Sequence, residues 1–192
     1  VPFYLKHADM RLPEPEPQAS DPFNLLLALA GLIVASHKKI TPRLQETIRD
    51  MERALAVRLD WQNMLIQTDE KSVVAYHDIQ KFWQERMAAH YDTILRRWLQ
   101  LQLSLTLHPF AGLGEKISDR TTLIGVRLAT FKLALMCACG IRRDVLPEES
   151  AVRIAQSLAR LLDHLGDAAF SLQIYAETGW TKEARMRGAL ES

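Results

Sequence analysis

The chain has 192 residues, of which 48% are hydrophobic and 24% charged, so it has the composition of an ordinary globular protein and roughly the length of one domain. Its 24 Lys and Arg residues and 23 Asp and Glu residues give a net charge of +1, and neither sign gathers into the basic block typical of nucleic-acid-binding proteins. The two cysteines exclude a disulfide framework and favour a reducing compartment, so we expect a cytoplasmic protein. The longest apolar run, Leu25 to Ala35, is shorter than the roughly 18 residues of a membrane span, and we expect no membrane role.

The first 22 residues are predicted to form an extended, proline-rich arm or linker. Four prolines fall within residues 11–22, and proline opposes a helix because it lacks a backbone donor. The chain begins with Val1 rather than Met, which favours a fragment or a processed piece of a longer protein. The segment 1–22 is therefore either a link to an upstream region or a ragged terminus.

Helix start signals open the next two elements. Asp21-Pro22 and Thr41-Pro42 each place an N-cap acceptor before a proline at the first helical position. They predict a buried helix over 23–36 and an amphipathic helix after Thr41. The apolar stripe of the second helix comprises Leu44, Ile48, Met51, Leu55 and Leu59.

A further helix is predicted over 72–90, where apolar residues recur at helical spacing. Residues 99–107 are ambiguous, because leucines alternate there with polar residues as they do in a strand. Leucine is a strong helix former, and we find no partner strand elsewhere in the sequence. We therefore expect residues 99–107 to be helical.

A turn is predicted at 108–114, where Pro109 is followed by two glycines. A mostly apolar helix is then expected over 121–138. Gly140 suits the left-handed residue that commonly ends a helix. We therefore expect this helix to stop there.

The last part of the chain predicts two more helices and a tail. Pro147 and the two glutamates after it are typical of a helix start. The expected apolar side of that helix comprises Val152, Ala155, Leu158, Leu161, Leu162 and Leu165. Gly166 and Gly179 bracket a short helix, and residues 179–192 are expected to form a polar tail. The prediction is an all-α protein, an irregular bundle of about six or seven helices in a single domain over 23–178.

The sequence carries no self-sufficient catalytic or metal-binding motif. Gly112 and Gly114 follow no predicted strand and lack the rest of a phosphate-binding glycine pattern. Cys137 and Cys139 lie about 200° apart on a helix and cannot chelate one ion together, so we interpret both as small core residues. The six histidines are too scattered to indicate a ligand set, and no metal site is predicted.

The best local candidate for chemistry is the polar group Arg160, Asp163 and His164 in an otherwise apolar helix. Arg160 lies one turn before His164, so the two share a face. In a functional interpretation, Asp163 or His164 accepts a proton or orients a polar substrate. In a structural interpretation, His164 stabilises the end of the helix and Arg160 pairs with Asp163.

Two stretches together resemble the C-terminal region of the bacterial flagellin lysine-N-methylase family: DTILRRWLQLQLSLTLHPF (92–110) and RIAQSLARLLDHLGDAAFSLQI (153–174). In that family a helix leads into a Phe-Pro-Phe turn, and a later helix carries an arginine followed by a Glu-His pair. This chain has His-Pro-Phe at 108–110, and its later helix has Asp163 in place of the glutamate, which preserves the charge. The family's Asn-Tyr pair before the turn is not matched.

The resemblance implies the helical C-terminal portion of an S-adenosylmethionine-dependent methyltransferase that N-methylates lysines of flagellin, its protein substrate. It also implies a 4Fe-4S cluster in a cysteine-rich N-terminal part. Two cysteines cannot supply the four thiolates that such a cluster usually takes, so we expect that part to be missing from this sequence. Arg160, Asp163 and His164 would then occupy the family's polar positions, with Asp163 or His164 accepting the proton of the substrate lysine.

A second interpretation stays open. A helical protein-interaction or ligand-sensing module without catalysis, such as a chaperone or part of a regulator, fits the same helices. The residues upstream of Val1 distinguish the two: four or more clustered cysteines favour the methylase, and a helix-turn-helix favours a regulator.

Overall fold

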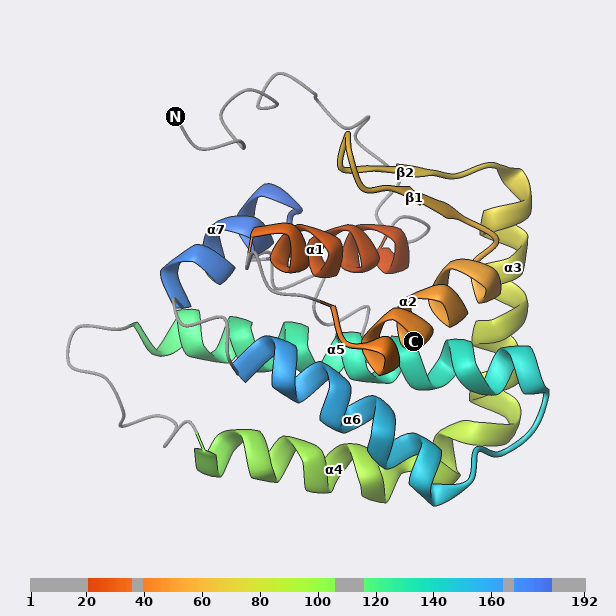
Figure 1. Cartoon of the computed structure of the whole chain (residues 1–192). Helices are drawn as coiled ribbons and strands as arrows, with labels where there is room; N and C mark the ends of the chain where they lie inside the picture. The colour runs from red at the N-terminus through yellow and green to blue at the C-terminus, as the bar shows by residue number, and fades with distance from the viewer. Residues whose placement is uncertain (1–20, 36–39, 106–115, 164–167, 181–192) are drawn as a thin grey trace.

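The structure of the chain, a computed structural model, describes residues 21–35, 40–105, 116–163 and 168–180 (Figure 1). Its helices are α1 (Asp21–Ala35), α2 (Pro42–Ala54), α3 (Glu70–Phe82), α4 (Ala88–Leu105), α5 (Ile117–Arg142), α6 (Glu148–Asp163) and α7 (Ala168–Glu177). A π-helical turn, Trp83–Met87, joins α3 to α4 without a break, so the described part of the chain has six continuous helical segments. The prediction of an all-α, irregular helical bundle is confirmed.

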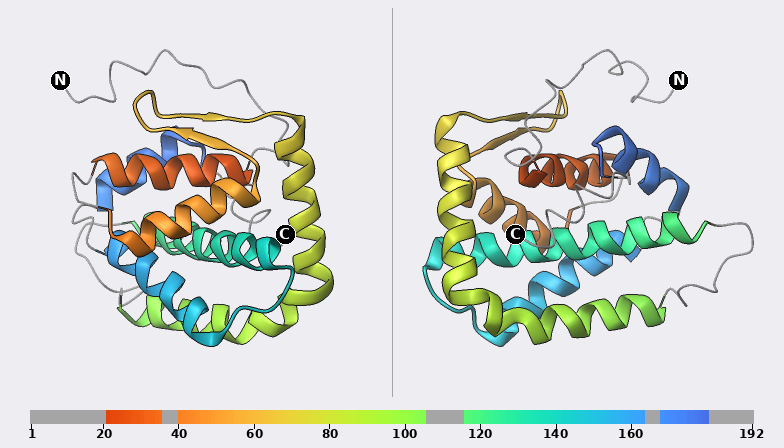
Figure 2. Two further views of the ribbon diagram at one scale, coloured as in Figure 1. Left: turned by 45° about the vertical axis from the view of Figure 1, so that its right-hand side comes forward. Right: turned by 180° about the vertical axis from the view of Figure 1, so that it is seen from behind.

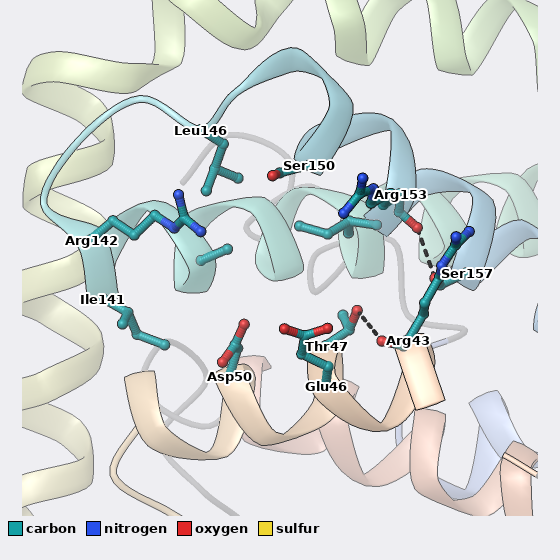
Figure 3. Close-up of a pocket in the computed structure, with 12 residues that line it drawn as sticks. Arg43, Glu46, Thr47, Asp50, Ile141, Arg142, Leu146, Ser150, Arg153 and Ser157 are labelled. Carbon is teal, nitrogen blue, oxygen red and sulfur yellow. Dashed lines mark hydrogen bonds between the residues drawn. The ribbon is translucent and has the colours of Figure 1, made fainter. Parts of the chain in front are cut away.

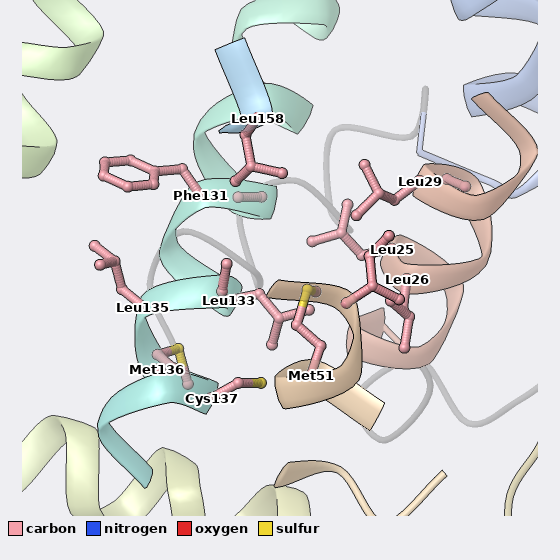
Figure 4. Close-up of a cluster of buried hydrophobic side chains, with 14 of the residues drawn as sticks. Leu25, Leu26, Leu29, Met51, Phe131, Leu133, Leu135, Met136, Cys137 and Leu158 are labelled. Carbon is pink, nitrogen blue, oxygen red and sulfur yellow. The ribbon is translucent and has the colours of Figure 1, made fainter. Parts of the chain in front are cut away.

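Helix α5 runs through the centre of the bundle (Figures 1 and 2). Helices α1, α2, α3, α4, α6 and α7 all contact it. Every residue from Thr130 to Gly140 is buried, so this part of the helix is enclosed on all sides. Figure 4 shows Met51 of α2 between the leucines of α1 and Leu133 of α5, and these residues belong to one hydrophobic core.

The length and composition of α5 would also allow it to cross a membrane. Among the described helices it alone meets that test, over Ser118–Arg142, yet 78% of its most apolar window is buried inside the bundle. Core helices of globular proteins pass the same test. Enclosure by six other helices therefore accounts for its apolar composition.

Helix α1 already includes Asp21 and Pro22, two residues before its predicted start, whereas α2 begins as predicted and ends earlier than predicted. The Thr41 hydroxyl oxygen accepts a hydrogen bond from the Leu44 N–H at 3.2 Å, and Pro42 occupies the first position of α2. The predicted stripe reached Leu59, but Leu55 is the C-cap residue and Ala56 has a φ of 50°. The helix cannot continue through this left-handed residue, so the prediction of helix up to Leu59 is wrong.

A short hairpin follows α2 where the extended helix was predicted. Strands β1 (Arg58–Asp60) and β2 (Leu65–Gln67) pair antiparallel, and Leu59 is buried from β1 rather than from a helix. The Asp60 carboxylate accepts the Asn63 N–H at 3.1 Å and the Asn63 side-chain N–H at 2.8 Å, which closes the turn. Three-residue strands are too short to leave a clear alternation in the sequence.

The helix predicted over 72–90 is part of a longer one that extends to Leu105. Asp69 and Ser72 form a capping box at its start, with the Ser72 N–H 3.0 Å from the Asp69 carboxylate. Helix is confirmed for the described part of 99–107, and residues 106–107 lie outside the described residues. A helix has 3.6 residues per turn, so leucines at every second position do not share one face. Leu101 and Leu105 are therefore 53% and 63% exposed, whereas the polar Gln102 is 2% exposed.

Helix α5 is longer at both ends than predicted. It runs through Gly140 to Arg142, and Arg143, with a φ of 56°, is the left-handed residue that ends it. The prediction that Gly140 stops the helix is therefore wrong. A Cβ atom at Gly140 would lie 2.8 Å from Cγ1 of Ile79, so the glycine permits close packing of α5 against α3. The turn predicted at 108–114 lies outside the described residues.

Helices α6 and α7 confirm the last two predicted helices, with two differences in burial. Val152 was predicted on the apolar side of α6 but is 44% exposed, and Ala151 is buried instead. Trp180 lies within the predicted polar tail, 179–192, but is fully buried in the core, so the prediction of a polar tail is wrong at this residue. The proline-rich arm up to residue 20, Leu165, and residues 181–192 lie outside the described residues.

We expect Gly140→Ala to lower the free energy of unfolding by about 1–2 kcal/mol, because overpacking outweighs the gain in helix propensity. Urea unfolding followed by circular dichroism measures the change. Gly31→Ala in α1 is the matched control, since the nearest side-chain atom to its Cβ would be Ile174 Cγ2 at an ordinary 3.5 Å. Equal stabilities of the two variants would contradict the close contact between α3 and α5.

Candidate functional site

The predicted polar group lies at the C-terminal end of α6. Arg160 is exposed on this helix, and Asp163 is the last residue of the helix. The Asp163 side chain and all of His164 lie outside the described residues. The structure therefore describes the position of one of the three predicted side chains, and the relation among the three stays a prediction.

Arg127 of α5 joins the two stretches that carry the family resemblance. Its guanidinium donates a hydrogen bond to the Gln102 side-chain oxygen at 3.2 Å and another to the Leu162 carbonyl at 2.7 Å. Gln102 belongs to α4, and Leu162 lies in the last turn of α6, where carbonyls lack helical partners. Arg127 thus holds the end of α6, next to Asp163, against α4 and α5.

The two cysteines are core residues. Cys137 and Cys139 are both fully buried, and burial raises the pKa of each thiol. Cys139 donates to the Tyr91 hydroxyl at 3.5 Å, and the same hydroxyl accepts the Leu146 N–H at 2.8 Å. No three His, Cys, Asp or Glu residues within the described ranges lie together as a metal-binding group. These thiols do not fit the ligand set of an iron-sulfur cluster.

A groove with a volume of about 460 Å³ lies between α2, α5 and α6 (Figure 3). Residues 43, 46, 47 and 50 form one face of α2, and residues 150, 153, 154 and 157 form the facing side of α6. Both sets recur at the i, i+3, i+4, i+7 spacing that places side chains on one helix face. The end of α5, with Ile141 and Arg142, closes the groove at one side.

The groove combines apolar walls with hydroxyl and charged groups. Its buried apolar residues are Ala138 and Leu146. The Thr47 hydroxyl donates to the Arg43 carbonyl at 3.0 Å, and the Ser157 hydroxyl donates to the Arg153 carbonyl at 2.7 Å. Most of the lining residues are charged or carry a hydroxyl group, so the groove suits a polar ligand.

Charges of both signs line the groove, and Arg43 lies on the same helix as the two carboxylates. The carboxylates of Glu46 and Asp50 belong to α2, and Arg142 and Arg153 lie across from them on α5 and α6. Burial and the neighbouring Glu46 raise the pKa of Asp50, whereas the Arg53 and Arg142 guanidiniums lower it. Within the described ranges, no ion pair of 4.0 Å or less connects these α2 carboxylates to α5 or α6. The opposed charges therefore face a gap.

Lys132 of α5 is a second group that the sequence analysis missed. It is 7% exposed, and burial lowers its pKa to about 8. Its position between Phe131 and Leu133 in a predicted apolar helix could have indicated a buried lysine. The groove left no such signal, because its residues come from three helices and each looks like an ordinary surface position.

Comparisons of the chain with protein-family models, with curated proteins and with solved structures find no match.

We expect Arg127→Met to lower the free energy of unfolding by about 1–3 kcal/mol, because it leaves the Leu162 carbonyl and the buried Gln102 amide without this donor. Urea unfolding measures the effect. Arg160→Met is the control on the exposed face of α6 and should change stability by no more than about 0.5 kcal/mol. Equal losses in both variants would contradict the role of Arg127.

Lys132 makes a pH-dependent contribution to stability. Its folded-state pKa, about 8, is below its usual value of 10.5, so the unfolded chain binds more protons between these two values. The contribution of Lys132 to the free energy of unfolding is therefore least favourable below pH 8 and becomes more favourable toward pH 10.5. Lys132→Met should be more stable than the wild type by about 1 kcal/mol at pH 7, and the difference should shrink by pH 10.

Urea unfolding of both proteins at pH 7, 8, 9 and 10 tests this. The buried thiols and Tyr175, whose pKa burial raises to about 12, contribute equally to both proteins and cancel in the difference. A difference that stays constant over this range would show that Lys132 remains charged in the folded protein.

Proposed function

We propose that the chain is the helical C-terminal portion of an S-adenosylmethionine-dependent methyltransferase that N-methylates lysines of flagellin. One observation carries the proposal: the two stretches that resemble the flagellin lysine-N-methylase family, separated by about forty residues, pack on the same helix and are joined through Arg127. A family motif that is split between two helices can act as one site only if the two helices lie in the same structural unit. The proposal places the reactive end of this unit at the last turn of α6.

In this proposal, S-adenosylmethionine supplies an electrophilic sulfonium methyl group. The lysine nitrogen would form a bond to that methyl carbon as the carbon-sulfur bond breaks, and the electron pair of the broken bond would stay on the neutral sulfur of the leaving group. The nitrogen attacks only after losing its proton, so a base must be close to it. Asp163 or His164 is the proposed acceptor of that proton, and Arg160 is proposed to orient the charged groups around it.

The two proposed cofactors require different residues for binding. S-adenosylmethionine ends in an amino-acid group, and the groove between α2, α5 and α6 offers both the carboxylates and the arginines that such a group requires. An iron-sulfur cluster requires several accessible thiolates, which Cys137 and Cys139 do not offer. In the proposal the cluster is therefore held by a cysteine-rich part outside this sequence.

The second candidate function is a ligand-sensing or protein-interaction module without catalysis. The groove favours it, because a cavity with convergent charges binds ligands whether or not a reaction follows. The two candidates make different demands on α6: catalysis depends on Asp163 and His164, whereas sensing depends on the groove. Methyl transfer and ligand binding can therefore be measured separately.

Asp163→Asn and His164→Ala in the parent protein test the proposal. We expect the rate of flagellin methylation, followed by mass spectrometry with added S-adenosylmethionine, to fall by about 10²–10⁴-fold in the variant that removes the base. Glu85→Gln and His77→Ala are matched controls on the exposed face of the α3–α4 helix and should keep full activity.

Two results would count against the methyltransferase. Wild-type activity in both the Asp163 and His164 variants would remove their proposed role. A parent protein that has no cysteine cluster and transfers no methyl group to flagellin would leave the module without catalysis as the function.

A further inference from the structure

We propose that the groove between α2, α5 and α6 binds a zwitterionic ligand, either a free amino acid or the amino-acid end of a larger molecule. The ligand's carboxylate contacts Arg43 and Arg153, and its ammonium group contacts Glu46 and Asp50. For a free amino acid, this binding role goes beyond the proposed methyl transfer and does not depend on it. For the amino-acid end of S-adenosylmethionine, it rests on the proposed function.

The cationic end of the groove is formed from two helices. Figure 3 shows Arg43 extending from α2 toward Ser157, with Arg153 of α6 beside them. Arg153 contacts Glu149 at 3.4 Å, but an exposed pair one turn apart on a helix contributes little and is easily displaced. A carboxylate accepts two parallel hydrogen bonds from one guanidinium. Two exposed arginines at one end of the groove therefore suit an anionic group.

The acidic part of the groove lies one turn along α2. Glu46 and Asp50 are at i, i+4 spacing, so their carboxylates repel each other. This repulsion and partial burial raise the pKa of Asp50, although Arg53 lies 4.0 Å from it and lowers that pKa. An ammonium group between the two carboxylates would relieve the repulsion. Arg142 of α5 also lines this part of the groove and lowers the pKa of Asp50, but the two carboxylates outnumber it. An ammonium group there meets an excess of negative charge, and Arg43 and Arg153 at the other end meet the carboxylate of a zwitterion.

The remaining walls suit the body of such a ligand. Ala138 and Leu146 provide buried apolar surface, and Ile154 is half-buried beside them. The volume of about 460 Å³ falls within the range of about 300–1,000 Å³ that is usual for ligand pockets. There is room for an aliphatic side chain or for the rest of a larger molecule beyond the charged groups.

Isothermal titration calorimetry of the chain with leucine, N-acetylleucine and leucinamide tests the proposal. N-acetylleucine lacks the ammonium charge, and leucinamide lacks the carboxylate. We expect leucine to bind at least about 10-fold more tightly than either analogue, because each analogue loses one set of charge-assisted contacts. If leucine binds and either analogue binds as tightly, the groove recognises only one charge and the proposal is wrong.

Variants of the groove residues test which of them contact the ligand's carboxylate and which contact its ammonium group. In Arg43→Gln and Arg153→Gln, leucine should lose about 10-fold in affinity while leucinamide changes little. In Asp50→Asn, leucine should weaken while N-acetylleucine changes little. Arg49→Gln is the matched control, since Arg49 is an exposed arginine of α2 that does not line the groove. Equal weakening of all three ligands by every variant would overturn the assignment.

Titration with S-adenosylhomocysteine and with 5′-methylthioadenosine distinguishes a free amino acid from the amino-acid end of a larger molecule. The second compound keeps the nucleoside but lacks the amino-acid end. Binding of leucine alone supports a free amino acid, and binding of S-adenosylhomocysteine but not of methylthioadenosine supports the end of a larger molecule. Absence of saturable binding by both leucine and S-adenosylhomocysteine would overturn the proposal, whatever the flagellin assay shows.

Discussion

Burial of α5 is the constraint on which the rest of the structure depends, because a helix that is apolar on all sides has to be covered along its length. Its 26 residues contact six other helices, and Val126, Phe131 and Leu135 have no exposed surface. Burying a large apolar side chain contributes about 1.5–3 kcal/mol, so the sum over this helix dominates the folding energy. The surrounding helices take their positions from the need to cover it.

This central role also explains where the polar groups lie. Helices α2 and α6 both pack on α5 and contact each other, so their charged faces meet along the groove. Charges cannot enter the core without a large cost and collect where the helices leave space. Arg127 is the exception: it is half-buried, and its hydrogen bonds join α4, α5 and α6. Lys132 is a second exception, and its lowered pKa reflects the cost of burial.

The predicted helices were found because their caps and periodicity are local features. Thr41 and Pro42 start α2 through bonds that span three residues, and helix through Leu105 follows from residue propensity despite the alternating leucines. The end of α2 was missed because a left-handed Ala56 leads into a hairpin that propensity does not reveal. The role of Gly140 was missed because its reason, Ile79, lies on another helix.

The helical class, the starts of most helices and the amphipathic face of α2 could be predicted from the sequence, since these features depend on contacts within a few residues. The sequence also placed Arg160, Asp163 and His164 together at one helix end, where their chemical role stays a prediction. The packing of distant helices, in contrast, brings Glu46, Asp50 and Arg153 to one groove and lets Arg127 join two distant stretches. Those relations depend on how helices cross over α5, and no spacing along a single helix contains that information.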